Sequence, residues 1–399
     1  MSDTPPYGIP LGDAGTPMPG LPAETPAGLG KEAIYCPRCP GWYRLSAIKA
    51  TAQDGTVTSA DKIMLRVTSN PKPRMSIFAS KRKQPELTQA LRADIVAKSY
   101  KLHCPRDHNL VNSLEPATVV GIIGNVHSSK SHYLAGLVYE LIYEQQLSCI
   151  DADVAYIGDT GKTMDERIHA IYQDGDILQT TERGHVGGPF SYRLTRHAQT
   201  SMQSKAILTF FDVAGEDCVG LASSADFVRY LFNATGIVLL IDPDGLPSPG
   251  RPLSARGNAS LTSRAIIDNL ADALEAVTGR HAHEQDHIIC IAIAKADSAD
   301  LASPVWPPEF WMTKSEGRIR RSELRASLRE YSEQCKRALS LLGGQSLINA
   351  AETRFRPGQV FYSAVSATNQ APLDQRWVGA QPVGCTIPLA QILCFSSIE

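Results

Sequence analysis

The chain has 399 residues, with 39 Lys and Arg against 41 Asp and Glu, and 43% of its residues are hydrophobic. This length favours two or three domains, and the near-neutral balance excludes a strongly basic nucleic-acid coat. No apolar run approaches the ~18 residues that span a bilayer, and the first residues lack a secretion signal. We therefore expect a cytoplasmic protein, with neither a membrane nor a nucleic acid as its partner.

Three segments differ in composition. Residues 1–30 contain seven Pro and six Gly, which predicts a disordered tail. Residues 31–114 contain clustered cysteines and a Lys/Arg/Pro-rich insertion at 70–89. For the insertion we favour disorder over contact with a nucleic acid or an acidic partner. Residues 115–399 are regular, and we expect them to form one domain.

In that third segment, short apolar runs alternate with helical periodicity, which predicts an α/β fold with a largely parallel sheet. Leu134, Leu137, Val138, Leu141 and Ile142 have the spacing of one helix face. A second helix is expected over 322–342 with a solvated basic face, and an amphipathic one within 371–399 that caps the sheet. The expected strands are Thr118–Ile123, Phe190–Leu194, Ala206–Val213, Gly236–Ile241, Ile288–Ala294 and Gln359–Val365.

The first strand runs into a candidate phosphate-binding loop. Gly124 is followed by Asn125, Val126, His127 and Ser128, and then by Ser129, Lys130 and Ser131, which approximates G-x-x-x-x-G-K-[ST] with Ser129 in place of the second Gly. Backbone N–H groups at a helix start can cradle phosphates, Lys130 would reach the β/γ-phosphates, and the Ser131 hydroxyl would hold Mg²⁺. An ordinary strand–turn–helix is the alternative. A second Gly-Lys-Thr at 161–163 lacks the leading Gly and the buried strand, so we expect a loop there.

Three later strand ends carry matching groups. Asp212, at the end of one strand, can enter the Mg²⁺ shell, and Gly215 can offer its N–H to a γ-phosphate. Another strand ends in Ala294-Lys295-Ala296-Asp297, and the last in Ser363-Ala364. Strand ends at one crevice of an α/β sheet are where ligands bind.

With these motifs, the chain from about Pro116 onward resembles the P-loop GTPases of the TRAFAC class. The run Gly236–Pro243 and the Cys-rich module are similar to those of bacterial GTPase-like proteins from predicted conflict or defence gene clusters. The resemblance implies a three-layer P-loop NTPase sheet with helices on both faces. It also implies GTP/GDP and Mg²⁺ as ligands and a protein effector or assembly partner.

The resemblance assigns roles to residues by position. Asp297 would accept hydrogen bonds from the guanine base, Lys295 would pack its stem on the base, and Ser363-Ala364 would form the last guanine box. His132 borders the phosphate loop. A switch threonine that binds Mg²⁺ is expected before the Phe190 strand, where Thr180 and Thr181 both fit and Thr181 is favoured slightly.

Departures from the family pattern bear on activity. Ala294 replaces an Asn or Thr that braces the base, which makes guanine selectivity less secure than phosphate binding. Glu216 stands where relatives place the Gln that orients water, and a carboxylate there could act as a weak base or could repel the γ-phosphate and slow hydrolysis. We therefore expect a switch with slow hydrolysis in which Lys130, Glu216 and Thr181 are the catalytic candidates. A catalytically inactive scaffold and an ATPase remain the alternatives.

The Cys-rich module predicts a structural zinc site. Cys36 and Cys39 have the two-residue spacing of a zinc knuckle, and Cys104 with His108 could complete a Cys₃His set. His103 and Asp107 compete for the fourth position. Because the second half lacks a clean C-x-x-C, a degenerate knuckle or plain buried thiols are the alternatives.

Overall fold

The computed structural model describes residues 33–36, 41–63, 100–108, 110, 117–124, 129–157, 160–178, 186–196, 204–213, 231, 233–246, 259–297, 307–308, 311, 319–374 and 376–396. These residues fall into two compact units that divide between Ala117 and Thr118. Within these ranges no helix is both long and apolar enough to cross a membrane. The predicted tail at 1–30 and the basic insertion at 70–89 lie outside the described residues.

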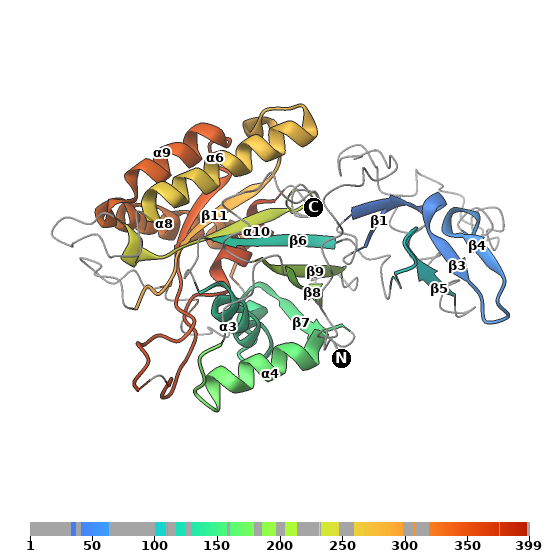
Figure 1. Cartoon of the computed structure of the whole chain (residues 1–399), viewed down its shortest axis with the longest axis horizontal. Helices are drawn as coiled ribbons and strands as arrows, with labels where there is room; N and C mark the ends of the chain where they lie inside the picture. The colour runs from blue at the N-terminus through green and yellow to red at the C-terminus, as the bar shows by residue number, and fades with distance from the viewer. Residues whose placement is uncertain are drawn as a thin grey trace, which may run out of the picture. The chain divides into compact units, whose positions relative to one another are not determined.

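A seven-stranded sheet forms the centre of the larger unit, with the order β12-β11-β10-β6-β9-β8-β7 (Figure 1). Neighbours among β12, β11, β10 and β6 are parallel, whereas β9, β8 and β7 pair antiparallel. Strands β6, β10 and β11 are buried at every position, as expected for strands covered on both faces. The strands are β6 (Ala117–Gly124), β7 (Ala152–Tyr156), β8 (Val186–Arg196), β9 (Ser204–Val213), β10 (Gly236–Ile241), β11 (Ile288–Ile293) and β12 (Val360–Ala364). All six predicted strands are confirmed, and so is the α/β fold class.

The segment around the second Gly-Lys-Thr differs from the prediction of a loop. Residues Ala152–Tyr156 form the edge strand β7, and Thr160–Tyr172 form helix α4, which includes Lys162. The acidic residues that argued against a strand are tolerated because β7 is an edge strand and Asp153 is exposed. In the sheet, β7 lies three strands away from β6.

Helices cover the sheet on both faces. Figure 1 shows α6 (Ala259–Thr278), α8 (Arg321–Leu339) and α9 (Gln345–Arg354) on one side, and α3 (Lys130–Ile142) with α4 on the other. Helix α3 begins directly after the candidate phosphate loop, as its periodicity predicts. The described residues of this unit also form the short helical turns η2 (Gln146–Ile150), η4 (Pro243–Gly245), η5 (Ala282–Glu284) and η6 (Ser340–Gly344), and those of the smaller unit form η1 (Leu45–Ala47).

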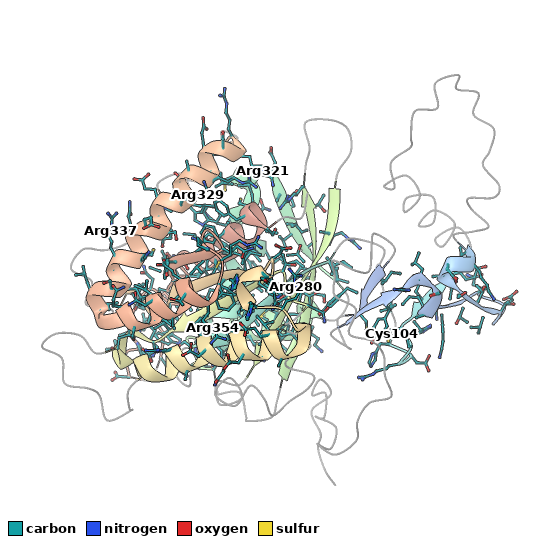
Figure 2. The ribbon with its side chains drawn as sticks, turned by 90° about the horizontal axis from the view of Figure 1, so that it is seen from above. Cys104, Arg280, Arg321, Arg329, Arg337 and Arg354 are labelled. Atoms are coloured by element: carbon teal, nitrogen blue, oxygen red, sulfur yellow. The ribbon has the colours of Figure 1, made fainter. Side chains whose placement is uncertain are left out.

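Helix α8 confirms the predicted amphipathic pattern. Its apolar stripe, Leu324, Leu328, Tyr331, Cys335 and Leu339, is buried. Three of its arginines, Arg321, Arg329 and Arg337, are exposed and are labelled in Figure 2. The helical path continues from Leu339 into η6 and breaks at Gly343, whose φ is +88°, before α9.

The last helix, α10 (Ile387–Phe395), is buried on all sides from Ile387 to Cys394 and contacts β11, β12 and α8. The expectation of an amphipathic helix was therefore wrong, although the helix does cover the sheet as predicted. Its N-terminus is anchored by Glu140 of α3. That buried carboxylate accepts hydrogen bonds from the N–H groups of Cys385 and Thr386, at 3.1 and 2.8 Å, and from the Thr386 hydroxyl at 2.7 Å.

The smaller unit is built from short strands. A hairpin pairs β1 (Ala33–Cys36) with β2 (Gly41–Arg44), and a three-stranded sheet has β3 (Lys49–Thr51) between β4 (Val57–Ser59) and β5 (Lys101–His103). They enclose one small core that contains Cys36 and Cys104, both with no exposed surface. A core of this size gives limited hydrophobic stabilisation, which is the setting in which small units use metals.

Candidate nucleotide and metal sites

Four parallel strands of the large sheet end at one edge. The register places Gly124 of β6 beside Leu240 of β10, and Ile293 of β11 beside both Ile241 and Ala364 of its neighbours. The residues that follow these ends are therefore close in space, as at the ligand-binding edge of α/β sheets. These residues include most of the described candidates from the sequence.

The candidate phosphate loop joins β6 to α3. Gly124 is the last residue of β6, and Lys130 is the first of α3. The buried Lys130 ammonium donates to the Gly124 carbonyl at 3.3 Å, so its side chain reaches back to the end of β6. Ser131 follows in the first turn of the helix. Asn125, Val126, His127 and Ser128 lie outside the described residues.

Ser129 adopts a left-handed backbone, with φ +58° and ψ +35°. This conformation disfavours a residue with a Cβ and explains why the motif normally has glycine at this position. Its carbonyl still accepts the first bond of α3, from the Tyr133 N–H at 2.8 Å. The serine thus keeps the backbone path that the loop requires, at a conformational cost.

His132 connects the helix start to two other segments. Its Nε2 accepts a hydrogen bond from the Leu178 N–H at 3.3 Å, and its ring meets Trp377 edge to face at 6.1 Å. Leu178 precedes the region in which the switch threonine is expected. Thr180 and Thr181 themselves, with Gly215 and Glu216, lie outside the described residues. Asp212 is the penultimate residue of β9, which neighbours β6, and nothing is described of its side chain.

The base side of the site is formed by the loop after β11 and the loop after β12. The Ser366 hydroxyl donates a hydrogen bond to the carboxylate of Asp297. The Ser366 hydroxyl oxygen in turn accepts one from the Asn369 N–H at 2.8 Å. The Ala296 N–H also donates to the Val365 carbonyl at 3.1 Å. The two loops are therefore joined, and Asp297 is oriented by its neighbour.

Ser363 and Ala364, the predicted last guanine box, lie inside β12. Ser363 has no exposed surface, and its Oγ has no hydrogen-bond partner among the described residues. Ala364 is 3% exposed. The same Ser-Ala pair recurs three residues later as Ser366-Ala367, beyond the strand end, and there the serine contacts Asp297.

Asp242 is a residue of this edge that the sequence reasoning did not select. It follows β10, its side chain is 7% exposed, and its Oδ2 lies 2.9 Å from the Lys295 ammonium. Its other oxygen accepts from the Asp244 N–H at 3.1 Å. The sequence signal that could have identified Asp242 is its position directly after an apolar strand, within the run Gly236–Pro243.

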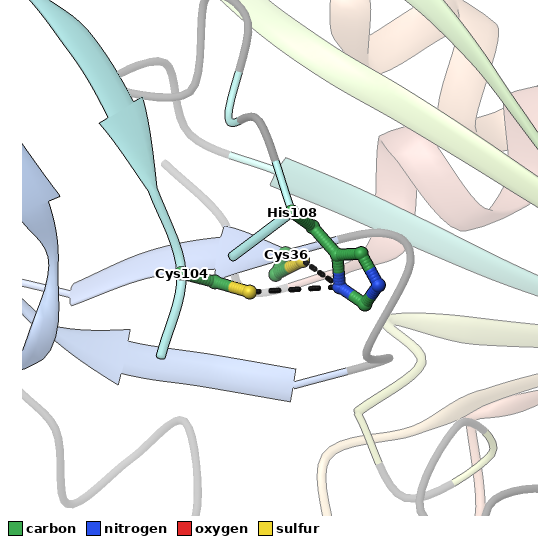
Figure 3. Close-up of side chains that lie close together, drawn as sticks. All are labelled: Cys36, Cys104 and His108. Carbon is green, nitrogen blue, oxygen red and sulfur yellow. Dashed lines mark hydrogen bonds between the residues drawn. The ribbon is translucent and has the colours of Figure 1, made fainter. Parts of the chain in front are cut away.

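A second site lies in the smaller unit, where Cys36, Cys104 and His108 converge (Figure 3). The Nδ1 of His108 is 3.5 Å from the Cys104 sulfur and 3.9 Å from the Cys36 sulfur. Both cysteines are buried, and the three ligand atoms lie within 4.8 Å of one another. Of the competing ligands, Asp107 is exposed and ion-paired with Lys49 at 2.8 Å. Cys39 lies outside the described residues.

Comparisons with known proteins identify the larger unit. A sequence profile named Double-GTPase 2 matches residues 118–349, more than half of the chain. None of the curated proteins matches. Similar solved structures include Sup35 complexed with GDP, with 14% identity over 65% of this chain and 39% of that chain, and a TM-score of 0.26.

Two further structures are similar over comparable lengths. The signal recognition particle receptor SRb-GTP/SRX complex from Chaetomium thermophilum has 12% identity over 66% of this chain and 97% of that one, with a TM-score of 0.29. The GTP-bound Ski7 GTPase-like domain of S. cerevisiae has 13% identity over 71% and 52%, with a TM-score of 0.28. TM-scores this low leave the assignment resting on the family profile.

The family profile identifies the larger unit as a P-loop GTPase, and its α/β fold agrees with that class. The chain belongs to the Double-GTPase 2 family.

Proposed function

We propose that this chain is a molecular switch that binds GTP with Mg²⁺, hydrolyses it slowly and signals to a protein partner. The observation that carries the proposal is the pairing of Asp297 with Ser366 at the end of β11. A carboxylate fixed in this way can accept the N1–H and N2–H of guanine, whereas it would repel the N1 acceptor of adenine. Family membership supports the same ligand.

On the phosphate side, Lys130 would exchange its bond to the Gly124 carbonyl for the β/γ-phosphates. Ser131, Asp212 and Thr181 are the proposed holders of the magnesium ion. When bound, Mg²⁺ neutralises charge on the β- and γ-phosphate oxygens. The backbone of residues 124–129 and the N-terminus of α3 provide the N–H groups that cradle phosphate.

Slow hydrolysis follows from Glu216 at the water-orienting position. A carboxylate next to the γ-phosphate repels it, and it positions the attacking water less well than the amide of the usual Gln would. The nucleotide state would then last long enough to be read by a partner. Membership of a bacterial conflict system belongs to the same proposal and rests on the resemblance alone.

For the smaller unit we propose a structural zinc ion held by Cys36, Cys104 and His108, with Cys39 as the fourth ligand. Zinc bonds of about 2.3 Å to sulfur and about 2.0 Å to nitrogen, at tetrahedral angles, separate the sulfur and nitrogen atoms by roughly 3.5 Å. The distances of 3.5 and 3.9 Å fit this geometry. Thiolate and imidazole ligands suit zinc, and four protein ligands leave no open position for catalysis.

The test begins with nucleotide released from the purified full-length protein, followed by multiple-turnover hydrolysis of GTP and ATP with Mg²⁺. We expect guanine nucleotide, slow GTP turnover, and loss of both in Lys130→Ala. Lys162→Ala is the matched control, because Lys162 is an exposed lysine in the other Gly-Lys-Thr segment. Rapid GTP turnover contradicts the slow switch, and binding without residual hydrolysis supports the scaffold instead.

A further inference from the structure

Lys295 and Asp242 form an ion pair across two neighbouring strand ends. Asp242 follows β10, Lys295 follows β11, and the carboxylate and ammonium are 2.9 Å apart. The aspartate side chain is 7% exposed and that of the lysine 29%. A carboxylate this deeply buried is stabilised by its charge partner and by the Asp244 N–H, so the pair is held in one geometry.

The lysine has an alternative anion nearby. Asp297 is only two residues further along the same loop, and Lys295 enters that loop with a left-handed backbone, φ +50°. An ammonium that paired with Asp297 would occupy the oxygens that are needed to read the base. In the structure the charges are divided, since Asp242 holds Lys295 and Ser366 holds Asp297.

The position of Asp242 also bears on Ala294. The side chain that normally braces this loop is missing there, and Ala294 is 3% exposed, with its N–H donated to the Ile241 carbonyl at 2.8 Å. Asp242 directly follows Ile241. The brace to the loop after β11 therefore comes from the neighbouring strand, through a charged side chain instead of a neutral one.

We propose that Asp242 is a specificity-determining positioning residue, which holds the Lys295 ammonium away from Asp297 and so keeps that carboxylate available to guanine. The inference rests on the proposed guanine site and deepens it. Asp242 acts through Lys295 and does not itself touch the nucleotide.

A purely local role for Asp242 predicts different behaviour. Its Oδ1 caps the turn Pro243–Gly245 through the Asp244 N–H, and an asparagine caps such a turn as well as an aspartate does. If capping were its whole role, Asp242→Asn would leave every nucleotide affinity unchanged. If the residue merely supported the fold, its loss would weaken guanine and adenine nucleotides equally.

The experiment measures the affinities of the full chain for labelled GDP, IDP and ADP in wild type and Asp242→Asn. We expect GDP binding to weaken by roughly tenfold, which corresponds to about 1.4 kcal/mol. ADP binding should change little, so the ratio of the two affinities falls. Asp244→Asn, an exposed aspartate in the same turn, is the matched control and should bind GDP like wild type. Thermal unfolding reports whether each variant is folded.

A double variant tests whether Asp242 acts through Lys295. In Lys295→Met no ammonium remains to be diverted, so adding Asp242→Asn should cause no further loss of guanine preference. An equal loss for GDP and ADP, an unchanged GDP affinity, or an additive effect in the Lys295→Met background would each overturn the inference. Wild-type protein without guanine selectivity would instead refute the proposed guanine site on which it rests.

Discussion

The hydroxyl of Ser366 donates a hydrogen bond to the carboxylate of Asp297, 69 residues earlier in the chain. This contact joins the loop after β12 to the loop after β11 and fixes the orientation of the carboxylate before any ligand arrives. Pre-orientation of a charged group lowers the cost of ordering it on binding.

Two serines three residues apart allow a matched test of this contact. Ser366→Ala removes a hydrogen bond to a charged group, which is typically worth about 1.5–3 kcal/mol, so we expect GDP affinity to fall roughly ten- to a hundredfold. Ser363→Ala removes only a buried hydroxyl that has no hydrogen-bond partner in the described part of the chain. This variant should leave GDP affinity unchanged. It should raise the free energy of unfolding slightly, because burying the hydroxyl costs its hydrogen bonds to water and no bond in the protein replaces them.

Titration of labelled GDP and chemical denaturation of both variants check these two results. If Ser363→Ala weakened GDP binding while Ser366→Ala did not, the last guanine box would lie within β12 as its sequence suggested.

The left-handed Ser129 predicts a stabilising substitution. Glycine adopts this backbone without the penalty of a Cβ, of roughly 1–2 kcal/mol, but it loses about 0.5–1 kcal/mol more entropy on folding. We therefore expect Ser129→Gly to be as stable as wild type or up to ~1.5 kcal/mol more stable, with nucleotide affinity retained or improved. Ser129→Val should be destabilised instead, since a β-branched residue fits this backbone poorly. Denaturant unfolding of wild type and the two variants measures these differences in unfolding free energy. A Ser129→Gly variant less stable than wild type would contradict the argument.

Glu140 gives the large unit a pH dependence. Burial raises the pKa of this carboxyl from 4.5 to about 7, although three hydrogen bonds from Cys385 and Thr386 oppose the shift. The pKa of Glu140 is higher in the folded protein than in the unfolded chain, so folding favours the protonated carboxyl. The stability that this carboxyl contributes is fully present below about pH 4.5 and is lost as the pH rises through about 7.

Glu140→Gln has no ionisation at this position, so its free energy of unfolding should lack this decline. The measurement is the difference in unfolding free energy between wild type and Glu140→Gln across that interval, with Glu330→Gln on the exposed face of α8 as the control. A constant difference between wild type and Glu140→Gln would show that the carboxyl does not titrate there.

The metal site predicts a change in zinc content. Wild-type protein should carry about one zinc ion per chain, and Cys104→Ala should lose most of it. Cys335→Ala, a buried cysteine of α8 outside the cluster, should keep it. Metal analysis of the purified full-length proteins after dialysis checks this, and equal zinc in Cys104→Ala and wild type would rule out the proposed ligand set.

The central strands were predictable from sequence because each is a short apolar run that a parallel sheet buries on both faces. The edge strand β7 was missed because one side of an edge strand tolerates charge, as Asp153 does. Helix α10 was predicted to be amphipathic, but it is buried on every side. The short run of apolar residues in this segment did not distinguish a fully buried helix from one with a solvent-exposed face.

Within the candidate site, the strand and the helix that flank the predicted phosphate loop could be predicted because their pattern lies in consecutive residues. The base side was harder, since it depends on contacts between separate loops. Ser363-Ala364 and Ser366-Ala367 are equivalent as sequence, and only the end of β12 distinguishes them. Asp242 was overlooked because its partner, Lys295, is 53 residues away.

Guanine-selective binding, with the phosphates at the loop after β6 and the base at the loop after β11, is the central claim, and side-by-side equilibrium titration of labelled GDP and ADP with Mg²⁺ tests it most directly. We predict that the full chain binds GDP at least roughly tenfold more tightly than ADP. We also predict that Lys130→Ala abolishes the binding while Lys162→Ala preserves it. Comparable affinities for the two nucleotides, or full GDP affinity in Lys130→Ala, would contradict the claim.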